Sequence, residues 1–260
     1  MNIEQRVRKY TERGFQKFES EILVLMEESA AAIFTAFPDN FVVFGGAALV
    51  LFHDSPRLSR DLDLSTTPAA LPSTPEIQAA VGSGIQPLAE VFGLGQLEFR
   101  NDPPVAGFVR HWVLAGGKPL FSIDLTGIAG SVLKSQIVKH SIAAEPDKIV
   151  LSPTAEYLLF QKCETFLNRR FLKARDGFDI HLLVGRGVSL DKNLHAHLED
   201  FILMTEIDDA FIEERIHKID RKLCTAELRP VLPTAIFDDL ARQDFEPIRQ
   251  SLRTVFADWL

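Results

Sequence analysis

Cysteine is scarce in this chain of 260 residues, and long hydrophobic runs are missing. Cys163 and Cys224 are too few for a disulfide framework and lack the spacing of zinc ligands, so we expect two buried thiols. No apolar run approaches the roughly 18 to 20 residues that cross a bilayer, and the N-terminal segment is charged where a secretory signal would be apolar. These absences predict a folded, cytoplasmic protein without a membrane segment.

An excess of positive charge is missing as well. The chain has 28 lysines and arginines against 36 aspartates and glutamates, which gives a formal net charge of −8. This balance argues against a surface that binds nucleic acid throughout by releasing counterions. Residues 168–175 are the densest basic run, with Arg169, Arg170, Lys173 and Arg175. Taken alone, such a run is more simply explained as a solvated helix face than as a local track for nucleic acid.

The first half of the chain has the spacing of a small mixed sheet with flanking helices. Helical periodicity alternates with runs that are continuously apolar or that alternate with polar residues, as strands do. We expect one or two helices over residues 5–37, then helices at 47–52 and 76–92, with a proline-rich linker at 71–75. The expected strands are residues 41–44, 61–64, 95–100, 109–115 and 121–125, with a hairpin turn at Gly116-Gly117.

The second half changes character after about residue 153. Segments with helical spacing and charged faces follow one another at residues 154–167, 174–184, 190–204, 207–222 and 234–259. We therefore predict an α/β (α+β) fold in which an α/β domain with N-terminal helices, residues 1–152, precedes an all-helical domain, residues 153–260.

Asp61 and Asp63 form the feature that points most directly to chemistry. Because alternate residues of a strand share a face, their carboxylates should stand a few ångströms apart on one side. Such a pair can bridge divalent ions through hard oxygen ligands, and two Mg²⁺ ions held in this way activate an attacking hydroxyl and neutralise phosphates. Asp124 offers a third carboxylate on another strand-like run. These acids favour a metal and triphosphate site.

Gly45-Gly46 supports this interpretation, because the pattern predicts that a strand ends there and a helix begins. Such a turn presents backbone N–H groups and a helix N-terminus to an anion. Each part also has a purely structural explanation: a tight turn for the glycines, a loop cap for Asp61 or Asp63, and an edge-strand position for Asp124. Their occurrence together favours the site.

These residues resemble a known family. Gly45-Gly46, followed by Ser59 and by Asp61-Leu62-Asp63-Leu64, is similar to the Gly-Gly or Gly-Ser…Asp-x-Asp signature of the DNA polymerase beta-like nucleotidyltransferase superfamily. More narrowly, it resembles the AbiEii/AbiGii toxin group. That resemblance implies a nucleotidyltransferase-type sheet in the first domain.

A second block matches a later helical motif of the same group, with Lys162, Arg169 or its neighbour Arg170, Arg175-Asp176 and Asp179. Asp176 and Asp179 are three apart and share a helix face, and a lysine or an arginine fork can bind phosphate. Without the first block, an interhelical salt bridge would be the simpler explanation of this charge pattern. With both blocks in order, the catalytic interpretation is favoured.

The resemblance implies a metal-dependent transfer of a nucleoside monophosphate from an NTP to a hydroxyl acceptor. The expected catalytic residues are Asp61, Asp63, Asp124 and Asp176, of which Asp61, Asp63 and Asp124 would bind Mg²⁺ or Mn²⁺. The expected nucleotide-binding residues are Gly45, Gly46, Ser59, Lys162, Arg169 and Asp179.

The implied biology is that of a toxin in a type IV toxin–antitoxin or phage-defence system. Its acceptor would be RNA, including a tRNA end, or a protein, and an antitoxin would be encoded nearby. Two alternatives stay open: a small-molecule nucleotidyltransferase of the antibiotic-modifying type, and a non-catalytic nucleotide-binding module.

Overall fold

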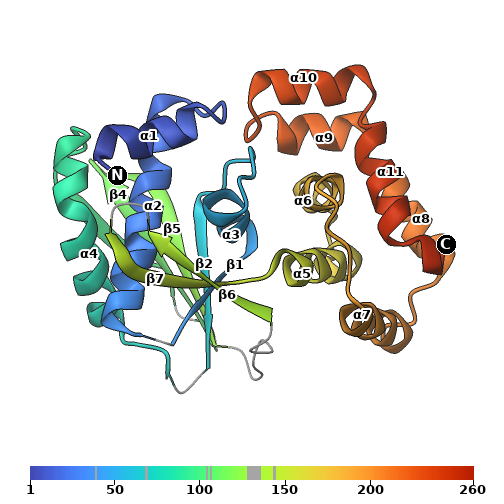
Figure 1. The fold of residues 1–260 in the computed structure, drawn as a ribbon, viewed down its shortest axis with the longest axis horizontal. Coiled ribbons are helices and arrows are strands. Elements are labelled where there is room, and N and C mark those ends of the chain that lie inside the picture. Colours follow the sequence, from blue (N-terminus) through green and yellow to red (C-terminus); the bar gives the residue numbers. More distant parts are fainter. Residues whose placement is uncertain (39, 68–69, 104, 106, 128–135, 143–144) are drawn as a thin grey trace. The chain divides into compact units, whose positions relative to one another are not determined.

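The computed structural model describes residues 1–260 except 39, 68–69, 104, 106, 128–135 and 143–144. The chain divides into two compact units, Met1–Pro153 and Thr154–Leu260. The first unit contains a five-stranded sheet, a two-stranded sheet and helices, whereas the regular elements described in the second are all helices (Figure 1). This mixed α/β architecture confirms the predicted fold class.

The five-stranded sheet of the first unit has the order β1-β2-β5-β4-β3. Its strands are β1 (Val42–Phe44), β2 (Asp61–Thr66), β3 (Leu97–Asn101), β4 (Phe108–Ala115) and β5 (Lys118–Gly127). Only the β2–β5 pair is parallel among these neighbours, so the sheet is mixed. The turn from β4 to β5 is made by Gly116 and Gly117, whose φ angles of 53° and 74° suit a tight hairpin. The predicted hairpin is therefore confirmed.

Helices α1 (Ile3–Thr11), α2 (Lys17–Ala36) and α4 (Thr74–Val91) complete most of the core of this unit. Helices α2 and α4 pack against each other, and they also contact β5 and β3, respectively (Figure 1). They cover the sheet face that carries the buried residues Leu62 and Ile123. The two helices do not cover the opposite face, which carries Asp61, Asp63 and Asp124.

Helix α4 begins at Thr74, two residues before its predicted start at residue 76. Ser73 caps it through a reciprocal pair of hydrogen bonds with Glu76, and Pro75 occupies the first turn, where its missing N–H is not needed. The linker prediction of 71–75 is wrong at its end because Thr74 and Pro75 form the first turn of this helix.

A hairpin that the sequence did not predict follows the large sheet. Strands β6 (Ile137–Ile142) and β7 (Glu145–Pro153) pair antiparallel, and β7 contacts β1 and α2. Two prolines in β7 and charged residues such as Lys139 weaken the local strand signal. Pairing and burial against α2, which are tertiary effects, decide the conformation here.

The second unit consists of α5 (Ala155–Asn168), α6 (Ala174–Gly185), α7 (Lys192–Met204), α8 (Asp209–His217), α9 (Arg221–Leu228), α10 (Thr234–Arg242), α11 (Glu246–Val255) and the short 3-10 helix η3 (Ala257–Trp259). Helix α6 is central, because it contacts α5, α9 and α11. Phe166, Ile180 and Phe256 are among the fully buried residues of this core.

Two predicted helices are each divided in two. The segment 207–222 is interrupted between α8 and α9, where Asp220 caps α9 by accepting a hydrogen bond from the Leu223 N–H. The segment 234–259 is interrupted between α10 and α11, where Asp244 and Phe245 have φ angles of 52° and 58°. Helical periodicity continues across both interruptions, so spacing alone could not reveal them.

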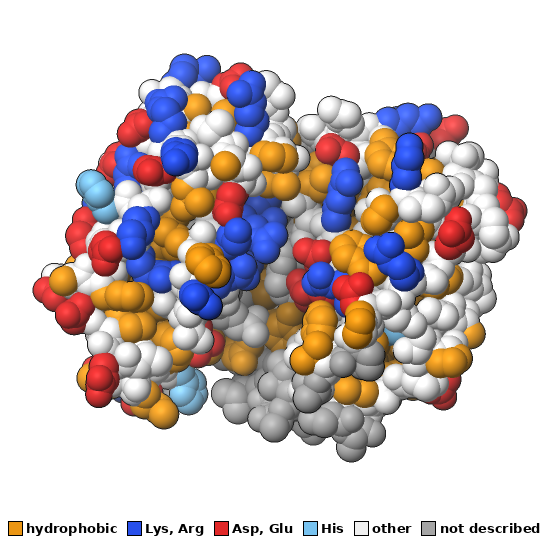
Figure 2. Space-filling model, turned by 180° about the vertical axis from the view of Figure 1, so that it is seen from behind, with side chains coloured by type: hydrophobic (Ala, Val, Ile, Leu, Met, Phe, Trp, Pro, Cys, Tyr) orange, Lys and Arg blue, Asp and Glu red, His pale blue; other side chains and the backbone are white. Residues whose placement is uncertain are grey.

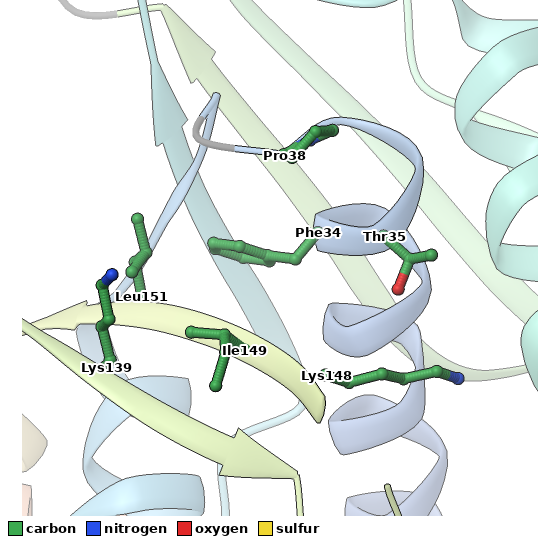
Figure 3. Close-up of a pocket in the computed structure, with 7 residues that line it drawn as sticks. All are labelled: Phe34, Thr35, Pro38, Lys139, Lys148, Ile149 and Leu151. Atoms are coloured by element: carbon green, nitrogen blue, oxygen red, sulfur yellow. The ribbon is translucent and has the colours of Figure 1, made fainter. Parts of the chain in front are cut away.

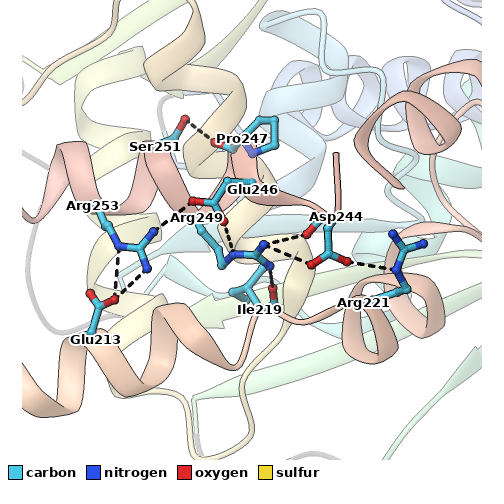
Figure 4. Close-up of polar contacts among 9 residues, drawn as sticks. All are labelled: Glu213, Ile219, Arg221, Asp244, Glu246, Pro247, Arg249, Ser251 and Arg253. Carbon is cyan, nitrogen blue, oxygen red and sulfur yellow. Dashed lines mark hydrogen bonds and ion pairs between the residues drawn. The ribbon is translucent and has the colours of Figure 1, made fainter. Parts of the chain in front are cut away.

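Arginine–carboxylate contacts connect these shorter helices (Figure 4). Arg253 of α11 pairs with Glu213 of α8 at 2.7 Å. Arg249 donates to the carbonyl oxygens of Ile219 and Asp244, each at 2.8 Å. The breaks in the helical chain are thus stabilised by side chains of α11.

No helix among the described residues is both long and apolar enough to cross a membrane.

Candidate functional site

Strand β2 presents Asp61 and Asp63 on one face of the large sheet. Both aspartates are half-buried, whereas the alternating Leu62 and Leu64 are 0% and 1% exposed on the other face. Burial of the two leucines in the core fixes which face of the sheet carries the aspartates. A register shift of one residue would place the aspartates in the core and the leucines on the other face. The shared face predicted for the two carboxylates is therefore what the strand adopts.

Strand β5 places Asp124 beside Asp63. The parallel register pairs Asp63 with Asp124 and Asp61 with Ser122, so all four side chains emerge on the same face. The Ser122 hydroxyl donates a hydrogen bond of 2.9 Å to the Asp61 carboxylate. Asp124 is only 4% exposed. The predicted third acid thus lies next to the other two in the sheet.

Arg110 of β4 contacts Asp124, and nothing in the sequence motif pointed to it. Its Nε and Nη2 atoms donate to the two carboxylate oxygens at 2.8 and 2.5 Å. The hydrogen bonds to Asp124 raise the pKa of Arg110, so the guanidinium stays charged. Its carbon lies 5.7 Å from the ring centre of Phe108 and 5.3 Å from that of Trp112. Only the pairing of β4 with β5 brings this arginine to the acids.

The glycines begin helix α3 (Gly45–Phe52) directly after β1, and the helix contacts β2. Gly45 has a φ of 65°, and a Cβ there would lie 2.4 Å from an Asp63 carboxylate oxygen. A Cβ on Gly46 would lie 2.6 Å from the Ser59 hydroxyl and 2.7 Å from Arg57 Nη2. Ser59 and Arg57 are buried, at 8% and 5% exposure. The paired glycines therefore let the start of α3 approach Asp63 and the Ser59 loop closely.

The donor set on this face suits a hard divalent cation, because Asp61, Asp63 and Asp124 supply carboxylate oxygens. Among the described residues, however, no group of three or more histidine, cysteine or acidic side chains is arranged so that it could hold a metal ion. Asp124 is held by Arg110, whose guanidinium is the cation that both oxygens contact. The groups whose chemistry fits a metal are the half-buried Asp61 and Asp63 and the oxygen positions of Asp124 that Arg110 leaves open.

The second unit contains a separate charged cluster. Lys162 of α5 lies 2.7 Å from Asp179 and 3.5 Å from Asp176, both on α6. Arg169, at the end of α5, pairs with Asp176 at 3.1 Å. Asp176 and Asp179 are 1% and 0% exposed. Four of the motif residues, Lys162, Arg169, Asp176 and Asp179, thus meet in one cluster whose two acids are buried, and the interhelical ion pairs that were the simpler explanation of the pattern are present.

Arg169 rather than Arg170 makes the contact with Asp176. Arg170 is exposed, and its guanidinium lies 5.2 Å from the ring centre of Phe171. Phe171 itself is 69% exposed. The basic run is not a solvated helix face, because residues 169–173 lie between α5 and α6.

Arg215 of α8 joins this cluster from outside both motifs. Its Nη2 donates a hydrogen bond of 2.9 Å to the Arg169 carbonyl oxygen, and its guanidinium lies over the rings of Phe166 and Phe211. Burial lowers its pKa. In the sequence, Arg215 follows two glutamates on an amphipathic helix and looks like a surface residue, so no local signal identifies it.

A pocket of about 390 Å³ lies in the first unit between the end of α2 and the β6–β7 hairpin (Figure 3). It is lined by Phe34, Thr35, Pro38, Lys139, Lys148, Ile149 and Leu151. None of the predicted site residues lines it. This apolar pocket is therefore a separate feature from the acidic face.

The face shown in Figure 2 carries charges of both signs. Figure 2 shows lysine and arginine side chains interspersed with acidic and apolar ones on the face in view. Any nucleic-acid contact would accordingly be local.

Comparisons with known proteins find similarities that cover most of the chain. A sequence model of the family described as "Nucleotidyl transferase AbiEii toxin, Type IV TA system" matches residues 30–259. No curated protein matches the chain in sequence.

Two solved structures are similar to the chain. JHP933 from Helicobacter pylori is similar at a TM-score of 0.56 and 15% identity, over 91% of this chain and 90% of that one. MenT4, a nucleotidyltransferase toxin from Mycobacterium tuberculosis H37Rv, gives a TM-score of 0.48 and 12% identity over 97% and 93%. The likeness to JHP933 is one of fold alone.

Proposed function

The chain belongs to the family of AbiEii nucleotidyl transferase toxins, and from this premise we propose that it transfers a nucleoside monophosphate from an NTP to a hydroxyl of RNA with the help of divalent cations. Family membership makes the protein a nucleotidyltransferase. The observation that carries the rest is the shared face of Asp61 and Asp63, with Asp124 in register beside Asp63.

Asp61 and Asp63 are the proposed metal ligands, and Asp124 is the third. Bound Mg²⁺ or Mn²⁺ would neutralise the triphosphate and make the acceptor hydroxyl a better nucleophile. The Ser122 hydroxyl orients the Asp61 carboxylate through its 2.9 Å hydrogen bond. In the reaction, the acceptor oxygen bonds to the α-phosphorus, the bond between this phosphorus and the α–β bridging oxygen breaks, and pyrophosphate leaves.

Gly45 and Gly46 are proposed to hold the triphosphate. They begin α3, and the first-turn N–H groups of a helix have no acceptor within the helix. Those groups and the positive end of the helix dipole favour an anion. Ser59, which packs against Gly46, would add a hydroxyl donor.

Lys162, Arg169, Asp176 and Asp179 are proposed to contribute to nucleotide binding and catalysis from the second unit. Lys162 supplies a compact positive charge that two buried carboxylates fix in place. Arg169 is partly exposed, at 37% of its side chain, so its fork can reach a phosphate as well as Asp176. Arg215, which binds the Arg169 carbonyl oxygen, would position Arg169.

RNA is the proposed acceptor because of the segment between α5 and α6. It offers an exposed phenylalanine, Phe171, beside Arg170. Exposed aromatic rings next to arginines are typical of surfaces that stack unpaired bases, and each stacked base contributes about 1–3 kcal/mol. This local feature is compatible with a net charge of −8.

The test is pyrophosphate release from each of the four NTPs, with Mg²⁺ and total cellular RNA. We expect release to need RNA and to fall by about 10³-fold or more in Asp63→Asn, because a lost metal ligand removes several kcal/mol of transition-state stabilisation. Glu90→Gln, which removes an exposed charge from α4, is the control and should keep full activity.

The acceptor needs its own comparison. Phe171→Ala should raise the KM for RNA by roughly 5- to 100-fold, which corresponds to one stacked base, and Leu203→Ala, another exposed apolar residue of the second unit, should not. Equal KM values would remove the RNA assignment to this segment. Pyrophosphate release that depends on aminoglycosides instead of RNA would favour the small-molecule alternative. NTP binding without pyrophosphate release would favour a non-catalytic binding module.

A toxin role predicts growth arrest when the protein is expressed alone. Arrest should be relieved by Asp63→Asn and by a neighbouring antitoxin gene. Harmless expression of an active enzyme would contradict it.

A further inference from the structure

Arg110 contacts both oxygens of Asp124 through a bidentate pair of hydrogen bonds. An ionised carboxylate has about four lone-pair positions, and a guanidinium fork uses two of them. The same contact places one positive charge on a face that carries three carboxylates. Arg110 therefore limits both the number of free oxygen positions and the negative charge that the face offers to a cation.

This ion pair differs from the purely structural ones in the same unit. Arg6 pairs with Glu27 and Glu28 at 3% side-chain exposure, far inside the α1–α2 packing. Arg110, by contrast, is 31% exposed, and its partner is one of the three acids of the site. An arginine placed on that partner can change what the site binds.

The guanidinium is held in position by its neighbours. The rings of Phe108 and Trp112 lie on either side of it along β4, and the Trp112 indole N–H donates to Asp102 at 3.0 Å. Both distances are within the range of cation–π attraction, which favours this placement of the guanidinium. Arg110 is thus preorganised on the acidic face.

We propose that Arg110 is a positioning residue that orients Asp124 and weakens the binding of free divalent cations to the acidic face. The inference rests on the proposed function, since it assumes that the face binds metal. Its consequence is that tight metal binding requires the donor nucleotide, whose triphosphate supplies further oxygen ligands.

The experiment measures Mn²⁺ binding to the full-length protein by calorimetry, with and without a non-hydrolysable NTP analogue. Arg110→Gln should bind Mn²⁺ about tenfold more tightly than wild type when no nucleotide is present, because a repelling charge beside the site is gone. The kcat of nucleotidyl transfer should nevertheless fall, because Asp124 is no longer oriented. A role in folding alone would instead lower the melting temperature without tightening metal binding.

Two further variants separate charge from geometry. Arg110→Lys keeps the charge and loses the fork, so its Mn²⁺ affinity should stay near that of wild type while kcat falls. Arg100→Gln removes an exposed charge from the neighbouring strand β3 and should change both values little. If Arg110→Gln fails to fold, Arg110→Lys still tests the proposal. A Mn²⁺ affinity that differs from that of the wild type, together with an unchanged kcat, would then overturn it.

The outcomes distinguish this inference from the proposed function. Mn²⁺ binding that is lost in Asp63→Asn but equal in wild type and Arg110→Gln overturns the role of Arg110 and leaves the metal site standing. No Mn²⁺ binding to the wild type, with or without nucleotide, overturns both.

Discussion

The two units of this chain hold their carboxylates in opposite ways. In the first unit, Asp61 and Asp63 are half-buried on a sheet face beside the start of α3, and the Ser122 hydroxyl donates to Asp61. In the second, Asp176 and Asp179 are 1% and 0% exposed and are paired with Lys162 and Arg169. The first unit thus keeps its two aspartates partly exposed to solvent, whereas the second buries its two and pairs them with cations.

The difference predicts which substitutions should lower stability and which should lower activity instead. Removing one partner of a buried ion pair leaves an uncompensated charge that is costly to bury. Removing an acid from a half-exposed face should cost less, because solvent screens the charges there. The unfolding of each unit can be followed separately by tryptophan fluorescence, because Trp112 lies in the first unit and Trp259 in the second.

The largest effect is expected for Lys162→Met. It strands Asp179 without its 2.7 Å partner, so the free energy of unfolding of the second unit should fall by about 3–5 kcal/mol. Urea unfolding in a Trp112→Phe background, where fluorescence reports the second unit, measures this loss. Asp179→Leu added to Lys162→Met should recover much of it. A loss below about 1 kcal/mol, the value for exposed pairs, would break the contrast between the units.

The next largest effects are expected for two glycine substitutions in the first unit, which compare a position beside Asp63 with one away from it. Gly45→Ala and Gly116→Ala both put a side chain at positive φ, so each should cost about 1–2 kcal/mol. Only at Gly45 would the new Cβ meet Asp63, whereas nothing lies within 4 Å at Gly116.

Transferase activity should therefore fall in Gly45→Ala alone, with unfolding in a Trp259→Phe background as the stability measurement. Equal activity in the two variants would show that Asp63 tolerates displacement.

A smaller effect concerns pH. Burial lowers the pKa of His140 to about 4, with lesser contributions from His53 and Lys9. Because the unfolded state takes up its proton near pH 6.5 and the folded state only near 4, the stability of the first unit should fall as pH drops through this window.

His140→Phe, which keeps a ring against Phe52, should flatten that dependence. His217→Gln, an exposed residue of the second unit, is the control. An unchanged slope in His140→Phe would assign the acid sensitivity to other groups.

The smallest effect is expected for Arg253→Gln in the network of Figure 4. Arg253 and Glu213 are 37% and 47% exposed, so solvent screens the pair and its loss should cost less than about 1 kcal/mol. Urea unfolding at low and high salt tests this against Lys162→Met. A cost equal to that of Lys162→Met would mean that exposure does not explain the difference.

Much of the fold followed from local patterns. Alternation predicted the strand at Asp61, paired glycines predicted the β4–β5 turn, and helical spacing predicted the second half. The hairpin β6–β7 and the breaks before α9 and α11 did not follow, because packing and caps override a continuous or weak periodicity. The roles predicted for the site residues stay predictions.

The sequence by itself determined which chemical groups are present, their order along the chain and the family to which they belong. It could not determine which cation meets which acid. Arg110 reaches Asp124 through the register of β4 on β5, and Arg169 rather than Arg170 meets Asp176 because of how the chain leaves α5. Arg215 joins them from a helix 46 residues away. Such choices depend on contacts between distant segments, which only the tertiary structure decides.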